Sequence, residues 1–136
     1  LDMDTAMAIL NNRFQIMAQY RKQVIAPLVT QELTKVDASV RHRFRRAKRL
    51  LSRETSLLED RHHVRIETML AHSQALKTIY EKRLALQQIW ARTSANGHDM
   101  LAAMKEWVHE AEASGIHALH DFAAQLKTYS LRPTNA

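Results

Sequence analysis

The chain has 136 residues, of which 46 % are apolar and 25 % carry a formal charge, a balance typical of one globular domain. It contains no cysteine, which excludes disulfides and thiolate metal sites and favours a reducing compartment. The net charge is +6, and no run of about 18 apolar residues or signal-peptide pattern occurs, which argues against a membrane span or secretion.

The positive charge is concentrated in the first part of the chain. Residues 1–53 hold 11 Lys and Arg against 4 Asp and Glu, whereas residues 54–136 hold 9 against 10. Only 2 Gly and 2 Pro are present, so turns are scarce and helices are favoured throughout.

A first helix is predicted over Thr5–Leu33. One stripe of apolar residues at helical spacing predicts its buried face: Met7, Leu10, Phe14, Met17, Val24 and Leu28. Asp4 or Thr5 is expected to cap its start. Pro27 is expected to kink or end the helix near Ile25, because proline lacks an N–H and crowds the preceding turn.

A second amphipathic helix is predicted over Val36–Leu51. Its apolar face comprises Val36, Val40, Phe44, Ala47 and Leu51. Its other face is basic, and no acid interrupts the basic residues that run on to Arg53. We name as the basic cluster Arg41, Arg45, Arg46, Lys48, Arg49 and Arg53.

Two further helices are predicted in the middle of the chain. The capping box in residues 56–59, Ser-Leu-Leu-Glu, predicts a short helix to about Ala71. Ser73 is expected to cap the next helix, with one side formed by Leu76, Ile79, Leu86 and Trp90.

The last third predicts a helical hairpin. Asn96-Gly97 marks a turn, and His98–Ser114 carries a stripe of Leu101, Met104, Trp107, Val108 and Ala111. Gly115 fits a left-handed helix terminus. The same spacing returns within 116–129 at Ile116, Leu119, Phe122, Ala123 and Leu126.

Together these patterns predict an all-α bundle of five to six helices joined by short turns. We expect a single domain over residues 1–136, with residues 131–136 as a frayed tail. Because residue 1 is Leu rather than Met, the chain is expected to be the C-terminal fragment of a longer protein.

Histidine is frequent, with 8 residues, but its spacing does not define a metal site. Glu106-x-x-His109 has the spacing of a di-iron bundle motif, yet no second copy occurs. His62 and His63 are adjacent and point to different sides of a helix, so one ion cannot bind both. An exposed polar face is the simpler interpretation.

His117, His120 and Asp121 lie on one predicted helix, and the two imidazoles share a face one turn apart. No third ligand is singled out, so half-buried or surface histidines are favoured. No Gly-rich phosphate loop or nucleophile elbow occurs. The aromatic residues at core spacing are interpreted as packing: Trp90, Trp107, Phe122 and Tyr129.

The basic cluster is the one surface feature above background, and three interpretations compete. A solvated charged face is the simplest. A helix lying on anionic lipid is the second, and binding to the nucleic-acid backbone is the third. No aromatic residue is interleaved on the basic side, since Phe44 faces the other way, which weakens a single-strand stacking role for that helix.

Three segments carry a resemblance to a known family. Leu10–Pro27, Arg45–Leu58 with its RAKRLLSRE core, and Ala75–Pro133 with AEASGI resemble the cytosolic C-terminal region of proteobacterial delta-9-type fatty acid desaturases. The resemblance implies a parent membrane oxidoreductase of lipid metabolism that uses dioxygen and a di-iron centre held by histidine boxes. None of those boxes is present, so no cofactor or metal residue is assigned to this chain.

A second resemblance is to a group of DDE insertion-sequence transposases. Their helical region has a similar ending, matched here by the spacing from Ala111 to Leu126. Those enzymes carry an acidic residue in a D-R-F motif that binds catalytic metal, and this chain has Asn12-Arg13-Phe14 there. Asparagine brings no negative charge to Mg²⁺, and this departure favours the desaturase resemblance.

The sequence alone therefore predicts a non-catalytic helical module of a membrane fatty acid desaturase. The segment itself is expected to be soluble and to lie at the cytoplasmic face of the inner membrane. Its basic cluster is expected to contact anionic headgroups or an acidic redox partner. The alternative is a nucleic-acid-binding segment of a transposase-like protein, and a homo-oligomer is a further option.

Overall fold

The computed structural model describes residues 1–39, 41–42, 45, 60–91 and 97–129. Its elements are α1 (Met3–Asn11), α2 (Arg13–Tyr20), the π-helix η1 (Arg21–Ile25), α3 (Ala26–Leu33), α5 (Asp60–Leu70), α6 (Gln74–Ala91), α7 (Gly97–Glu112) and α8 (His117–Lys127). Within the described ranges no strand is present. The all-α prediction is confirmed.

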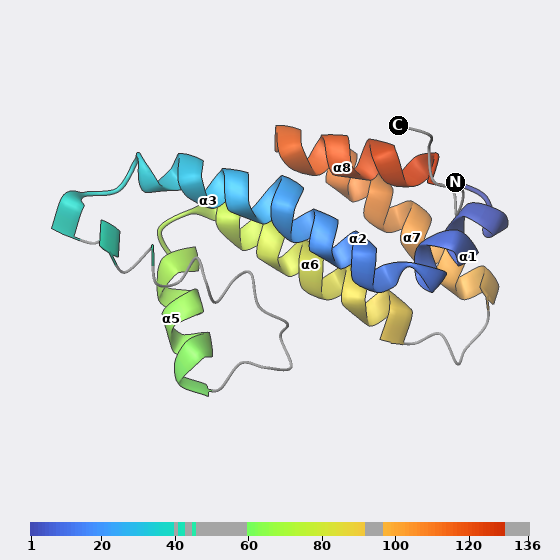
Figure 1. Cartoon of the computed structure of the whole chain (residues 1–136), viewed down its shortest axis with the longest axis horizontal. Helices are drawn as coiled ribbons and strands as arrows, with labels where there is room; N and C mark the ends of the chain where they lie inside the picture. Colours follow the sequence, from blue (N-terminus) through green and yellow to red (C-terminus); the bar gives the residue numbers. More distant parts are fainter. Residues whose placement is uncertain (40, 43–44, 46–59, 92–96, 130–136) are drawn as a thin grey trace.

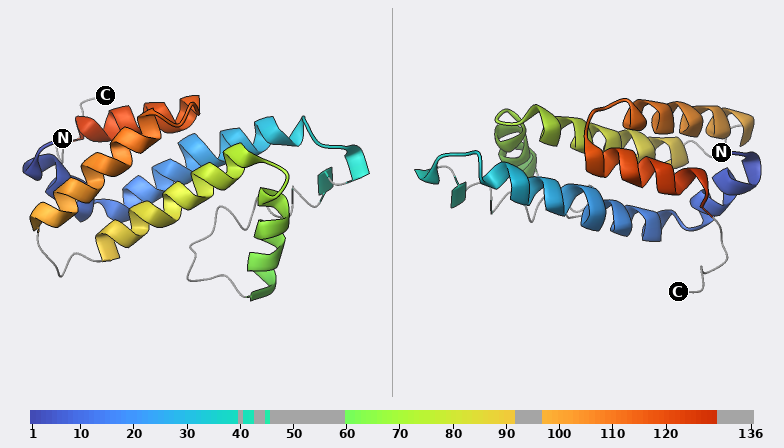
Figure 2. Two further views of the ribbon diagram at one scale, coloured as in Figure 1. Left: turned by 180° about the vertical axis from the view of Figure 1, so that it is seen from behind. Right: turned by 90° about the horizontal axis from the view of Figure 1, so that it is seen from above.

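Helices α2, η1 and α3 form one continuous rod, so the described residues make six helical segments (Figure 1). We call α2, η1 and α3 together the rod. The rod packs against α6, α7 packs against α6 and α8, and α8 returns to contact η1. The right-hand view of Figure 2 places α7 and the rod on opposite sides of α8. Helix α5 contacts α6 and lies across the end of the bundle where α6 begins.

Three aromatic rings join the rod to the α7–α8 hairpin. Tyr20 and Phe122 meet edge to face with centroids 5.1 Å apart, and Trp107 lies 6.1 Å from Phe122 and 6.5 Å from Tyr20. Their polar atoms also have partners. Tyr20 Oη donates to the carbonyl of Ile79, and Trp107 Nε1 donates to the carbonyl of Lys82 at 2.8 Å. The cluster therefore combines buried apolar area with satisfied polar groups.

The hairpin follows its predicted pattern. The predicted stripe residues of α8 are buried, as are Met104, Trp107, Val108 and Ala111 of α7, although Leu101 and Ile116 are only partly buried. Gly115 adopts φ +77°, the left-handed conformation expected after α7. Lys127 Nζ lies 2.8 Å from Glu112 Oε2 and links the last residues of the two helices.

The first predicted helix is interrupted, and two of its core predictions are wrong. The N-cap is Asp2, whose Oδ1 accepts the Thr5 N–H at 2.8 Å, rather than Asp4 or Thr5. At Asn12 the backbone leaves helical geometry, with φ −117° and ψ 24°. This break shifts the phase of the stripe, so Met7 is 40 % exposed and Phe14 is 69 % exposed.

The proline distorts the rod without ending it. Pro27 is the second residue of α3, and the helix continues through it to Leu33. The distortion precedes it, because the Ala26 N–H bonds the Arg21 carbonyl five residues back and the chain widens into η1. A local π-turn accommodates the missing proline N–H, which is why the predicted helix end near Ile25 is a π-helix instead.

The middle of the chain confirms two predicted boundaries. Helix α5 ends at Leu70, close to the expected Ala71, and Ser73 Oγ accepts the Leu76 N–H at 3.2 Å at the start of α6. Most of the predicted helix over residues 36–51, the capping box at 56–59 and the tail at 131–136 lie outside the described residues.

Candidate nucleic-acid interface

The structure places two members of the basic cluster. Arg41 is partly buried, and its Nη2 donates to the carbonyl of Val36 at 3.3 Å. Arg45 is exposed. The remaining predicted members lie outside the described residues: Arg46, Lys48, Arg49 and Arg53. The cluster as a continuous face is therefore still a prediction.

The rod and α7 differ in the charges that they carry. The rod carries Arg13, Arg21 and Lys22, and its one acid, Glu32, is 9 % exposed and lies 3.5 Å from Lys35 Nζ. Helix α7 has the opposite composition, with one lysine and the acids Asp99, Glu106, Glu110 and Glu112. In the right-hand view of Figure 2, α8 lies between α7 and the rod.

The exposed side of the rod is basic and rich in amides. Gln15, Gln19 and Lys22 are exposed there, next to Phe14. Glutamine side chains both donate and accept hydrogen bonds, and lysine donates to anions. This side presents donors and a positive charge to any polyanion that lies along it.

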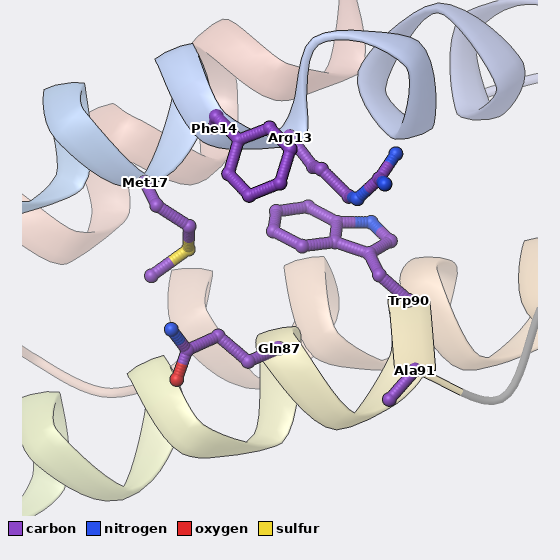
Figure 3. A pocket seen from close by; sticks show the side chains of 6 residues that line it. All are labelled: Arg13, Phe14, Met17, Gln87, Trp90 and Ala91. Carbon is purple, nitrogen blue, oxygen red and sulfur yellow. The ribbon is translucent and has the colours of Figure 1, made fainter. Parts of the chain in front are cut away.

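A pocket with a volume of about 300 Å³ lies between α2 and α6 (Figure 3). It is lined by Arg13, Phe14, Met17, Gln87, Trp90 and Ala91. The Arg13 Cζ lies 4.9 Å from the centroid of the Phe14 ring, and Arg13 Nη1 donates to the Leu10 carbonyl at 3.1 Å. The sequence does not reveal this pocket, because helical spacing predicts both Phe14 and Trp90 as packing residues.

Trp90 differs from the other indole of the chain. Its side chain is 6 % exposed, yet its Nε1 has no hydrogen-bond partner among the described residues. Trp107, in contrast, satisfies its Nε1 through the Lys82 carbonyl. The unmatched donor marks the pocket as a place where an acceptor would be stabilised.

Asn12 lies at the corner between α1 and α2, directly before Arg13. Its side-chain Nδ2 donates to the Ala8 carbonyl at 3.0 Å. Its main-chain carbonyl accepts the Ile16 N–H, also at 3.0 Å. The side chain thus closes the end of α1, and its carbonyl begins α2. This use of the amide is structural.

The candidate histidine motifs lie on three different helices, α5, α7 and α8. Asp121 contacts two histidines of the same helix. His117 Nε2 lies 3.2 Å from its Oδ2, and His120 Nδ1 lies 3.4 Å from its Oδ1. Glu106 and His109 are exposed on α7. Across the residues that the structure describes, no group of three or more His, Asp or Glu side chains is placed to hold a metal ion.

The two adjacent histidines of α5 lie in different environments. His62 is buried at 9 % exposure, whereas His63 is exposed. This agrees with the prediction that they point to different sides of the helix. In the described part of the chain, no helix has both the length and the apolar character that crossing a bilayer requires.

Comparison with known proteins decides the family. A family model named DDE_Tnp_ISL3 and described as a transposase matches residues 4–136. The chain belongs to this transposase family. It is also 29 % identical over 123 residues to the transposase for insertion sequence element IS1001 of Bordetella parapertussis. The match covers 89 % of this chain and 30 % of that protein, and no solved structure matches the chain.

The desaturase assignment is therefore wrong, and with it the interpretation as a module of lipid metabolism attached to an oxidoreductase. The transposase model and the transposase relative each cover most of the chain, and nothing in the comparisons indicates a desaturase. The placement at an inner-membrane face and the acidic redox partner depended on that assignment and lose their support. Asn12 in place of an acid does not separate the chain from the transposase family, whose pattern extends over residues 4–136.

Proposed function

We propose that this segment is a DNA-binding helical module of a transposase, and that the exposed side of the rod and the basic cluster contact the phosphate backbone. Membership of the transposase family supports a nucleic-acid partner. The observation that carries the proposal is the charge of the rod, which has Lys22 exposed and its one acid, Glu32, buried, with Arg45 exposed beyond its end. Along the rod itself, a polyanion meets cations and no exposed carboxylate.

The proposed contacts are mainly electrostatic. Lys22 and Arg45 would each neutralise a phosphate, and Gln15 and Gln19 would add hydrogen bonds to backbone oxygens. Such contacts release condensed counterions, so affinity falls as salt rises. We assign the segment a binding role rather than strand cleavage, because Asn12 supplies no negative charge to a magnesium ion.

The test is a fluorescence-anisotropy titration of this chain with a labelled blunt DNA duplex of mixed sequence. We expect binding that weakens steeply between about 50 and 200 mM salt. The double variant Lys22→Gln/Arg45→Gln should bind more weakly and lower the salt slope by about 0.9 for each phosphate that the variant no longer neutralises.

The matched control is Lys105→Gln, which removes one positive charge from the acidic helix α7. It changes the net charge in the same direction but leaves the rod intact, so its affinity should stay close to that of the unmodified chain. An equal loss of affinity in Lys105→Gln and in the single variants Lys22→Gln and Arg45→Gln would show that only net charge matters and would reject the proposed face. Sedimentation of the same samples tests the remaining prediction that the segment forms a homo-oligomer.

A further inference from the structure

The pocket between α2 and α6 joins two side chains that the packing of the bundle does not explain. Phe14 is apolar yet 69 % exposed, and Trp90 is buried with an Nε1–H that has no partner in the described residues. Burying a donor without an acceptor costs free energy. A ligand with a flat ring and an acceptor oxygen would cover the first side chain and satisfy the second.

The polar groups of the pocket also favour an electron-rich ligand. Figure 3 shows the Trp90 indole nitrogen on the side of the ring toward the Arg13 guanidinium. Both groups are donors that cannot accept a hydrogen bond. Arg13 Nη1 already donates to the Leu10 carbonyl, so an acceptor placed beside them would satisfy Trp90 Nε1 and meet the remaining Arg13 N–H groups. Gln87 points toward the opposite part of the pocket, where its amide can donate and accept. No carboxylate is among the six lining residues.

We propose that this pocket holds one unpaired nucleobase of single-stranded DNA, a proposal that rests on the DNA-binding function proposed above. The base stacks on the exposed Phe14 ring, and its carbonyl or the adjacent phosphate accepts from Trp90 Nε1 and Arg13. Aromatic platforms beside a cation are how proteins bind single strands without sequence preference. A base within a duplex is already stacked on both faces and cannot enter.

The size and position of the pocket agree with a single base. A volume of about 300 Å³ is at the lower end for ligand pockets, which suits one ring system rather than a folded chain. The pocket opens beside the basic side of the rod, so a strand whose phosphates follow Lys22 has one nucleotide within reach of Phe14. Duplex contacts and base capture are therefore separable functions of the same helix.

The test compares a single-stranded oligonucleotide of mixed sequence with the blunt duplex of that sequence. Phe14→Ala should weaken single-strand binding roughly five- to a hundredfold, the range expected for one base–aromatic stack. Its affinity for the blunt duplex should change less than about twofold on the same grounds. Phe14→Trp keeps a stacking ring and should restore single-strand affinity.

Met7→Ala is the matched control, because Met7 is also exposed and apolar but does not line the pocket. It should leave both affinities unchanged. Fluorine NMR of the chain labelled with 5-fluorotryptophan adds a direct readout. The single strand should shift the Trp90 signal, which Phe14→Ala identifies, and leave the signal of the buried Trp107 in place.

The outcomes separate this inference from the function it rests on. Duplex binding that depends on Lys22 and Arg45, combined with a Phe14→Ala variant that binds single strands normally, would overturn the base pocket and leave the DNA-binding function standing. No binding to either form would overturn both. Unequal shifts of the two tryptophan signals with loss of single-strand affinity in Phe14→Ala would support the pocket.

Discussion

Aromatic rings lie in the α7–α8 hairpin and beside the α1–α2 corner, but the two regions differ in how far these rings are buried and hydrogen-bonded. The hairpin buries Trp107 and Phe122 and gives the indole N–H a carbonyl partner at 2.8 Å. The corner leaves Phe14 69 % exposed beside a buried Trp90 whose N–H has no partner in the described residues. Rings that are buried and satisfied contribute stability, whereas rings left open beside a cation are available to a ligand.

The two regions also differ in charge. Helix α7 carries four acids and one lysine, and the carboxylate of Glu110 pairs with α6, with Lys82 Nζ 3.2 Å from Glu110 Oε1. The rod leaves Lys22 exposed and its one acid buried. We infer a division of labour in which the hairpin holds the fold together and the rod contacts DNA. The predictions below try to break that division, beginning with the largest effect.

Truncating the central ring of the hairpin should cost most. Phe122→Ala removes a 2 % exposed side chain that contacts both Tyr20 and Trp107. We expect a loss of about 3–5 kcal/mol in the free energy of unfolding, measured by urea denaturation followed by circular dichroism. A loss below about 1 kcal/mol would show that the hairpin does not hold the fold.

A substitution in the turn of the hairpin should cause a smaller loss of stability. Gly115 has φ +77°, and an added Cβ would meet no atom within 4 Å. Gly115→Ala therefore strains only the backbone, and we expect a loss of about 1–2 kcal/mol. Ala113→Gly, next to the turn and within ordinary conformational range, serves as a control. Equal stability of Gly115→Ala and the unmodified chain would contradict the left-handed turn.

The hydrogen bond from Tyr20 of the rod to Ile79 of α6 should contribute about 1 kcal/mol to the free energy of unfolding. Tyr20→Phe removes the hydroxyl that donates to the Ile79 carbonyl, a bond of ordinary net strength. Burial raises the pKa of the Tyr20 phenol, and the positive charge of Arg83 opposes this only in part. The folded chain therefore keeps that proton while the unfolded chain releases it above about pH 10, so stability falls as pH rises.

The same variant tests that pH dependence. Tyr20→Phe has no phenol to titrate at this position, so its thermal midpoint should decline less steeply than that of the unmodified chain as the pH is raised above about 10. Burial raises the pKa of Tyr80 as well, so part of the decline should remain. Identical alkaline profiles would mean that Tyr20 is not the buried donor described here.

The sequence predicts the hairpin better than the corner for a physical reason. In α7 and α8, stripe residues such as Met104 and Phe122 belong to uninterrupted helices, so helical spacing translates directly into burial. At the corner, the side chain of Asn12 bonds the carbonyl four residues back and ends α1. This change of phase depends on a single amide, and the stripe through Met7 and Phe14 gives no sign of it.

Of the candidate site, only the positive charge can be predicted from the sequence. The excess of basic residues in the first 53 positions pointed to an anionic partner, which agrees with the transposase family. The pocket was not predictable, because Trp90 and Phe14 lie 76 positions apart in sequence and meet only when the rod packs on α6.

The substitution with the smallest expected effect on stability tests the comparison of the hairpin with the corner most directly. Phe14→Ala should change the free energy of unfolding by less than about 1 kcal/mol, because the ring is exposed and the substitution removes only its stacking with the Arg13 guanidinium. Met17→Ala, one turn further along α2, removes a side chain that is 4 % exposed and should cost about 2–5 kcal/mol. The two substitutions thus separate the exposed side of α2 from its buried side. If Phe14→Ala cost as much as Met17→Ala, Phe14 would be a core residue, the helix would not change phase at Asn12, and the pocket beside Trp90 would lose its platform.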